Sequence, residues 1–160
     1  MNLSRLFLAL LVLSLPLLAA DKKQNKSSVR LYNPPTMAKP VSNYSQVAEV
    51  TGGKLVFIAG QVGLDPSGKL VSQDDFRAQT EQIFKNLKLA VEAAGGQMSD
   101  LVKVNYFVAE SVDPSQYATV REIRDRYINT AAAPASTFVV VKRLARPEYL
   151  IEVEAVAAIK

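Results

Sequence analysis

Residues 133–141 read Ala-Pro-Ala-Ser-Thr-Phe-Val-Val-Val, a run of β-branched and aromatic side chains that follows a proline. This composition is typical of a strand, and the uninterrupted apolar run predicts that the strand is buried on both faces. Toward the end of the chain, Glu152 and Glu154 alternate with apolar residues, so a second strand carries two carboxylates on one face. We expect this pair to lie beside residues 58–61, Ile-Ala-Gly-Gln.

The chain has 160 residues, of which 49% are hydrophobic, so a single domain with a substantial core is expected. It contains no histidine and no cysteine. These absences exclude a Ser-His-Asp or Cys-His nucleophile and a zinc site built from His and Cys. The groups left for chemistry are carboxylates, hydroxyls, lysine, arginine, backbone groups and water.

The net charge of +4 and the isoelectric point near 9.3 raise the question of binding to nucleic acid. Five of the basic residues lie between positions 21 and 40, where only Asp21 opposes them. Residues 41–160 contain 13 basic and 14 acidic residues. The basic character therefore belongs to the N-terminal segment, and a nucleic-acid partner is not predicted for the folded part.

Residues 1–20 are typical of a secretory signal peptide. Arg5 gives a positive start, residues 6–13 are apolar, and Leu18-Ala19-Ala20 resembles a small-residue cleavage site. Pro16 interrupts the apolar run, which is shorter than the ~20 residues of a membrane-spanning helix. We expect cleavage, and a periplasmic or secreted protein that then has no contact with the membrane; an uncleaved anchor is the alternative.

Residues 21–40 contain lysine, serine, asparagine and three prolines, which predicts a flexible leader or an extended segment at a sheet edge. The folded domain is expected to span residues 41–160. Its hydrophobic periodicity predicts elements in the order β-β-α-β-α-β-β. We expect strands at residues 41–50, 55–59, 101–109, 136–141 and 149–159, and helices at 72–94, capped by Ser72, and at 113–129.

This order predicts an α+β fold in which two helices cover one face of a single sheet. The other face is then left bare, although residues 55–59 and 138–141 are apolar on both sides. Association with further copies of the chain is the natural way to bury that face.

Several short motifs occur in a characteristic order along residues 41–160. They are YSQ at 44–46, IAGQV at 58–62, NLK at 86–88 with EAAG at 92–95, VKV at 102–104, PAST at 134–137 and IEVEAVA at 151–157. In order and spacing, this set resembles the RidA family of reactive-intermediate deaminases, also called the YjgF/YER057c/UK114 family. No single motif is specific; the resemblance rests on the whole set.

The resemblance implies a chorismate-mutase-like α+β protomer and a homotrimer whose sheets form a central β-barrel with three clefts between subunits. Active members of the family hydrolyse 2-imino or enamine acids to 2-oxo acids and ammonia, and they use no metal and no organic cofactor. A chain without histidine and cysteine is consistent with that chemistry.

The family's cleft residues correspond to positions of this chain one by one. Where the family has a Ser-Gly-Gln stretch, this chain has Ala59 and so lacks the hydroxyl. Arg121 matches a helix Asn, and Ser136 stands where the family has its signature Arg, which pairs with the substrate carboxylate. The resemblance thus implies Glu154 as the catalytic residue, and the substrate-binding residues expected are Tyr44, Ala59, Gly60, Gln61, Tyr106, Arg121 and Ser136.

Each of these residues also has a purely structural interpretation. Glu152 and Glu154 are then paired strand carboxylates, Arg121 a solvated helix charge, and the tyrosines packing residues. We predict a secreted family member that hydrolyses reactive imines or enamines in an inter-subunit cleft, with Glu154 holding the water. The alternative is a non-catalytic trimer that binds a small metabolite, since a Ser hydroxyl does not replace a buried cation. RNA cleavage is disfavoured by the near-neutral domain and the lack of histidine.

Overall fold

The computed structural model describes residues 27–160, so the predicted signal peptide and the start of the leader lie outside the described residues. The main body is a four-stranded sheet in the order β3-β6-β4-β5. Its strands are β3 (Lys54–Gln61), β6 (Ile151–Ile159), β4 (Leu101–Ala109) and β5 (Ala135–Val141). Within residues 27–160, no helix combines the length and the apolar character needed to cross a membrane.

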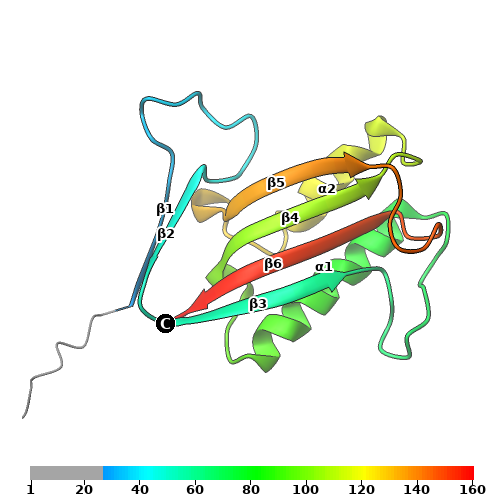
Figure 1. The fold of residues 1–160 in the computed structure, drawn as a ribbon, viewed down its shortest axis with the longest axis horizontal. Coiled ribbons are helices and arrows are strands. Elements are labelled where there is room, and N and C mark those ends of the chain that lie inside the picture. Colours follow the sequence, from blue (N-terminus) through cyan, green and yellow to red (C-terminus); the bar gives the residue numbers. More distant parts are fainter. Residues whose placement is uncertain (1–26) are drawn as a thin grey trace, which may run out of the picture.

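Two helices, α1 (Phe76–Ala93) and α2 (Tyr117–Arg124), cover one face of this sheet (Figure 1). Strand β6 is antiparallel to both β3 and β4, and β4 is parallel to β5. The parallel pair is possible because α2 forms the crossover that parallel strands require. The predicted α+β class, with two helices on one sheet face, is confirmed.

Helix α1 begins later than its sequence pattern predicts. Asp75, not Ser72, is the cap: its side chain accepts a hydrogen bond from the backbone N–H of Ala78 at 2.8 Å. The backbone carbonyl of Ser72 instead accepts from the side chain of Gln79. The helix stops at Gly95, whose φ of +85° is unfavourable for other residues.

The second predicted helix is shorter and divided. Asp113 caps a 3-10 turn, η2 (Pro114–Gln116), which leads directly into α2. The α-helix ends at Arg124, not at Asn129. Asn129 caps another 3-10 turn, η3 (Thr130–Ala132), by accepting from the N–H of Ala131 at 3.0 Å. An asparagine that ends a helical pattern in the sequence is here the start of the next turn.

The core lies between α1, α2 and the covered face of the sheet. The apolar stripe predicted for α1 is confirmed, because its large side chains on that side are fully buried. From the sheet, β4 and β6 supply every second residue. The main core side chains are Phe76, Ile83, Phe84, Leu87 and Val91 from α1 and Val104, Tyr106, Val108, Ile151, Val153, Ala155 and Ala157 from the sheet.

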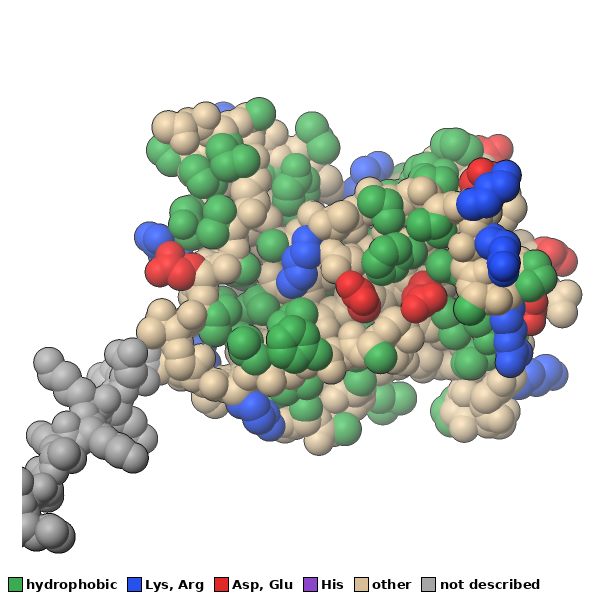
Figure 2. All heavy atoms as spheres, in the orientation of Figure 1, with side chains coloured by type: hydrophobic (Ala, Val, Ile, Leu, Met, Phe, Trp, Pro, Cys, Tyr) green, Lys and Arg blue, Asp and Glu red, His purple; other side chains and the backbone are tan. Residues whose placement is uncertain are grey.

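The opposite face of the sheet is open and largely apolar, so burial of the strands on both faces is wrong for the single chain. Phe57 is 77% exposed and Leu55 51%. On β5, Val139 lies on this face, opposite Phe107 of β4, and is also exposed. Figure 2 shows this open face, with hydrophobic side chains around acidic groups near the middle of the sheet. Nothing among residues 27–160 covers it, since both helices lie on the other side.

A separate two-stranded sheet, β1 (Ser28–Tyr32) with β2 (Val47–Thr51), projects from one end of the body (Figure 1). The first predicted strand therefore begins at Val47 and pairs with a segment expected in the leader, not with the main sheet. The connection between the two strands returns to the body, where the N–H of Ser45 donates to the carbonyl of Pro134 at 3.2 Å. This contact places the connection against the start of β5.

Candidate functional site

The strand register assigns the predicted site residues to opposite faces of one sheet. Glu154 is paired with Asn105, and neighbouring Ala155 with Val104, which in turn is paired with Ser136. Paired residues on adjacent strands point to the same side, and successive residues alternate. Glu154 therefore lies on the open face, whereas Ser136 lies on the side covered by the helices.

On the open face, Glu154 lines a cavity of about 310 Å³ together with Ala59 and Phe57. Its carboxylate is half-buried and accepts a hydrogen bond from Nδ2 of Asn105 at 2.8 Å. Lys103 lies in the same cavity, and its Nζ donates to Oγ1 of Thr137 at 2.6 Å. Asn105 and Lys103 were not among the predicted site residues, although the alternation in residues 101–109 places them on one face.

Gly60 makes room for the other carboxylate. A Cβ atom at this position would come within 1.8 Å of Oε1 of Glu152, so the Glu152 side chain packs directly on the Gly60 backbone. The expected proximity of the carboxylate pair and residues 58–61 is confirmed. The side chain of Gln61 bonds to its own strand and not to the cavity, since its Nε2 donates to the carbonyl of Ala59 at 3.0 Å.

Partial burial gives Lys103 an unusual environment. Desolvation lowers the pKa of its ammonium group, and the nearby Glu154 carboxylate acts in the opposite direction and raises it. The two residues are therefore electrostatically coupled on the open face.

This coupling predicts a measurable shift. In Glu154→Gln the pKa of Lys103 is expected to fall further, because the carboxylate that raises it has been removed. A titration of the lysine ¹³Cε resonances by NMR measures the change. Glu152→Gln is the matched control and is expected to leave the Lys103 titration in place. A Lys103 pKa that rises or stays constant in Glu154→Gln would contradict the coupling.

On the covered side, a second cavity of about 310 Å³ lies between α2 and the edge strand β5; we call it the α2–β5 pocket. It brings together four of the predicted residues, which come from the β1–β2 connection, β4, α2 and β5: Tyr44, Tyr106, Arg121 and Ser136. The remaining lining residues, which sequence reasoning missed, are Val41, Ser42, Tyr117, Val120, Arg124 and Phe138.

Aromatic side chains form one wall of this pocket. The ring centroid of Phe138 lies 6.0 Å from that of Tyr106 and 5.3 Å from that of Tyr117. Tyr106 is almost completely buried, and desolvation raises the pKa of its hydroxyl. It therefore stays neutral at physiological pH and remains a hydrogen-bond donor.

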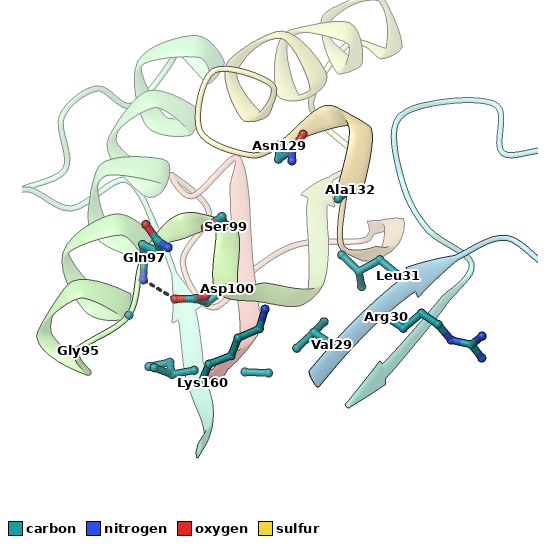
Figure 3. A pocket seen from close by; sticks show the side chains of 13 residues that line it. Val29, Arg30, Leu31, Gly95, Gln97, Ser99, Asp100, Asn129, Ala132 and Lys160 are labelled. Carbon is teal, nitrogen blue, oxygen red and sulfur yellow. Dashed lines mark hydrogen bonds between the residues drawn. The ribbon is translucent and has the colours of Figure 1, made fainter. Parts of the chain in front are cut away.

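A larger hollow, of about 870 Å³, separates the β1–β2 sheet from the end of the body (Figure 3). It is lined by β1, by the 3-10 turn η1 (Met98–Asp100) and by the end of β6, and it contains none of the predicted site residues. Its carboxylate Asp100 is already used, because it accepts from the N–H of Gln97 at 2.9 Å. Across residues 27–160, no group of three or more potential ligands is placed to hold a metal ion.

A protein-family model described as Endoribonuclease L-PSP matches residues 35–159. The chain belongs to this family. Among its L-PSP relatives is a RutC family protein of Pyrococcus horikoshii, 35% identical over 119 residues, which are 74% of this chain and 89% of the relative. A protein of Salmonella typhimurium named 2-iminobutanoate/2-iminopropanoate deaminase is 36% identical over 107 residues, covering 66% of this chain and 80% of the relative.

Solved structures of the L-PSP family agree with the fold. The structure of a conserved Rid-family protein from Yersinia pestis superposes with a TM-score of 0.73 at 34% identity, covering 82% of this chain and 98% of the other. RidA from a Psychrobacter species gives 0.59 at 35% identity, with coverage of 76% and 92%. The resemblance to the RidA family and its protomer fold is confirmed.

Proposed function

We propose that this protein hydrolyses small reactive imines or enamines to carbonyl compounds and ammonia, in clefts between the subunits of a homotrimer outside the cytoplasm. Its relatives in Salmonella typhimurium and Dermatophagoides farinae, at 36% and 29% identity, are named 2-iminobutanoate/2-iminopropanoate deaminase. The observation that carries the proposal is Glu154, a half-buried carboxylate oriented by Asn105 in a cavity on an apolar, uncovered sheet face.

The chemistry needs only a positioned water and a group that moves protons. The Glu154 carboxylate accepts a proton from water while the water oxygen bonds to the carbon of the protonated imine, which gives a neutral carbinolamine. The carboxyl group then returns the proton to nitrogen. The C–N bond breaks with its electron pair going to nitrogen, and ammonia leaves. The carboxylate takes the remaining hydroxyl proton and passes it to ammonia, so the oxygen that came from water becomes the carbonyl oxygen. No oxidant, reductant or metal takes part in this balance.

The positions of the two cavities support the proposed association of subunits. Within one chain, the sheet separates the Glu154 cavity from the α2–β5 pocket, so a small ligand does not contact both. In the trimer that we propose, the copies bury their open apolar faces against one another, and the Glu154 cavity of one copy faces the edge strand of another. Burial of exposed residues such as Phe57 favours this association.

A non-catalytic trimer that binds a small metabolite is the second candidate. It is favoured by two side chains: Ala59 carries no hydroxyl beside the Glu154 cavity, and Ser136 offers no cation in the α2–β5 pocket. In this alternative, the protein keeps the cleft of the RidA family and lacks the hydrolytic rate.

The test is direct. We expect the natural protein to accelerate the conversion of 2-iminobutanoate, generated in situ, to 2-oxobutanoate and ammonia, and to elute as a trimer in size-exclusion chromatography with light scattering. Activity that appears only in Ser136→Arg would support the binding alternative. Absence of activity in both proteins, or a monomer at micromolar concentration, would overturn the proposed cleft.

A further inference from the structure

We propose that the α2–β5 pocket binds the carboxylate of a small acid with an aromatic or bulky apolar side chain, and that Arg124 on α2 is its anion anchor with Arg121 at the rim. This inference deepens the proposed function, on which it rests for the reaction, by naming the cation and the substrate class. It places the anion-binding charge on a helix, and not on β5, where Ser136 lies.

The guanidinium of Arg124 has a buried N–H group without a hydrogen-bond acceptor among residues 27–160. Arg124 is only 5% exposed, yet it lines the pocket. Its Nε donates to Oδ1 of Asp125 at 2.8 Å, and its Nη2 lies 2.7 Å from the same oxygen without making a well-formed hydrogen bond. A guanidinium offers five N–H donors in a fork that matches a carboxylate, so one shared oxygen leaves much of that fork unused.

A second buried donor lies beside it. The O–H of Tyr106 donates to no acceptor among residues 27–160, and the guanidinium of Arg124 lies close enough to lower the pKa of this hydroxyl through its charge and through a side-chain hydrogen bond that the hydroxyl oxygen accepts. Leaving a buried polar group unpaired is unfavourable. Two such groups side by side, in the wall of a cavity, indicate that a ligand supplies the missing acceptors.

The position of Arg124 is fixed from outside the pocket. Asp125 accepts from Arg124 through Oδ1 and from Nδ2 of Asn43 through Oδ2, at 3.0 Å. Asn43 belongs to the β1–β2 connection, which supplies Tyr44 to the pocket rim and is tied to the start of β5 through Ser45. An anchor that is held before binding loses less conformational entropy when the ligand arrives.

The charges around the pocket favour a monoanion. Asp125 balances one of the two guanidinium groups, and the exposed Arg121 forms no ion pair within the described part of the chain. Arg121 and Arg124 are three residues apart on α2, so they lie on the same side of the helix. One positive charge therefore remains for one ligand carboxylate.

The rest of the lining favours an apolar ligand body. Tyr117, Val120 and Phe138 offer aromatic and aliphatic surface next to the two arginines. A cavity of about 310 Å³ is at the small end of typical ligand pockets. A compact acid with a single ring fits this combination of volume, charge and aromatic wall better than a short polar acid.

Binding of phenylpyruvate to the natural protein, measured by titration calorimetry, tests the assignment. We expect tighter binding of phenylpyruvate than of 2-oxobutanoate, and tighter than of phenylacetone, which lacks the carboxylate. Arg124→Lys, which keeps the charge but loses the fork, and Arg121→Gln are each expected to weaken binding of phenylpyruvate by at least about tenfold. The matched control is Arg126→Gln, because Arg126 pairs with Glu81 outside the pocket; it is expected to bind as the natural protein does.

Three results would overturn the inference: no binding of phenylpyruvate, equal binding of phenylacetone, or an unchanged affinity in both Arg124→Lys and Arg121→Gln. Because Arg121 is exposed, a loss of binding in Arg121→Gln is not explained by misfolding. The outcomes also separate this inference from the proposed function. Arginine-dependent binding without imine hydrolysis would support the ligand assigned to the pocket and contradict the proposed enzymatic activity. Hydrolysis of 2-iminobutanoate that is unaffected in Arg121→Gln and Arg124→Lys would support the proposed enzymatic activity and contradict the role of the two arginines as the anion-binding site.

Discussion

Replacement of Glu154 by glutamine is expected to reduce imine hydrolysis by about 10²–10⁴-fold, the usual range for loss of general acid–base catalysis. Glutamine has nearly the same shape, and its side-chain oxygen can still accept the hydrogen bond from Nδ2 of Asn105. The fold and the cavity therefore stay in place, while the group that takes the proton from water is lost. The rate of 2-oxobutanoate formation at saturating imine measures the effect.

Glu152→Gln is the matched control for this prediction. Glu152 lies two residues away on the same face of β6, but its carboxylate packs on the backbone of Gly60 and does not line the Glu154 cavity. We expect its rate to stay within about tenfold of the natural protein. Equal losses in both variants would indicate that the charge of the open face, and not a specific acid–base group, supports the reaction.

The sequence alone predicts β6 and α1 well because each has one buried side. The alternation in residues 149–159 places Ile151 and Val153 in the core and Glu152 and Glu154 on the other face, as the structure has them. The burial of β3 and β5 on both sides could not be resolved in the same way. An apolar strand shows that its side chains avoid water, but not whether the same chain or another copy covers them.

The residues of the α2–β5 pocket could not be predicted from the sequence for a different reason. In the sequence, residues 121–126 alternate between both signs of charge, which is typical of a solvated helix face, and Arg124 looks no different from Arg126. Asp125, which accepts from Arg124, also accepts from Asn43, a residue 82 positions away in the sequence that belongs to the β1–β2 connection. No periodicity within α2 reports such a long-range contact, so the anchor becomes visible only in three dimensions.

Loss of the Gln79 side-chain amide is expected to destabilise the fold strongly. Gln79 is fully buried in α1, and its amide joins the helix to two other segments. Its Nε2 donates to the carbonyls of Ser72 and Glu148 at 2.7 and 2.9 Å, and its Oε1 accepts from the N–H of Leu150 at 2.9 Å. Gln79→Leu keeps the approximate volume and removes these three hydrogen bonds, together with a longer one from Nε2 to the carbonyl of Gln73 at 3.4 Å. We expect a loss of about 3 kcal/mol in the free energy of unfolding, at about 1 kcal/mol for each bond.

Urea denaturation at a fixed protein concentration measures this loss, because association would otherwise change the apparent stability. Gln82→Leu is the control: Gln82 lies one turn further along α1, is half-buried, and makes a single side-chain bond to Asn86 at 2.9 Å, so a loss below about 1 kcal/mol is expected. Hydrogen exchange adds a local test. The Leu150 amide, which enters β6 just before Glu152 and Glu154, is expected to exchange fast in Gln79→Leu. If it stayed protected, the Gln79 amide would not be what holds the start of the strand that carries the carboxylates.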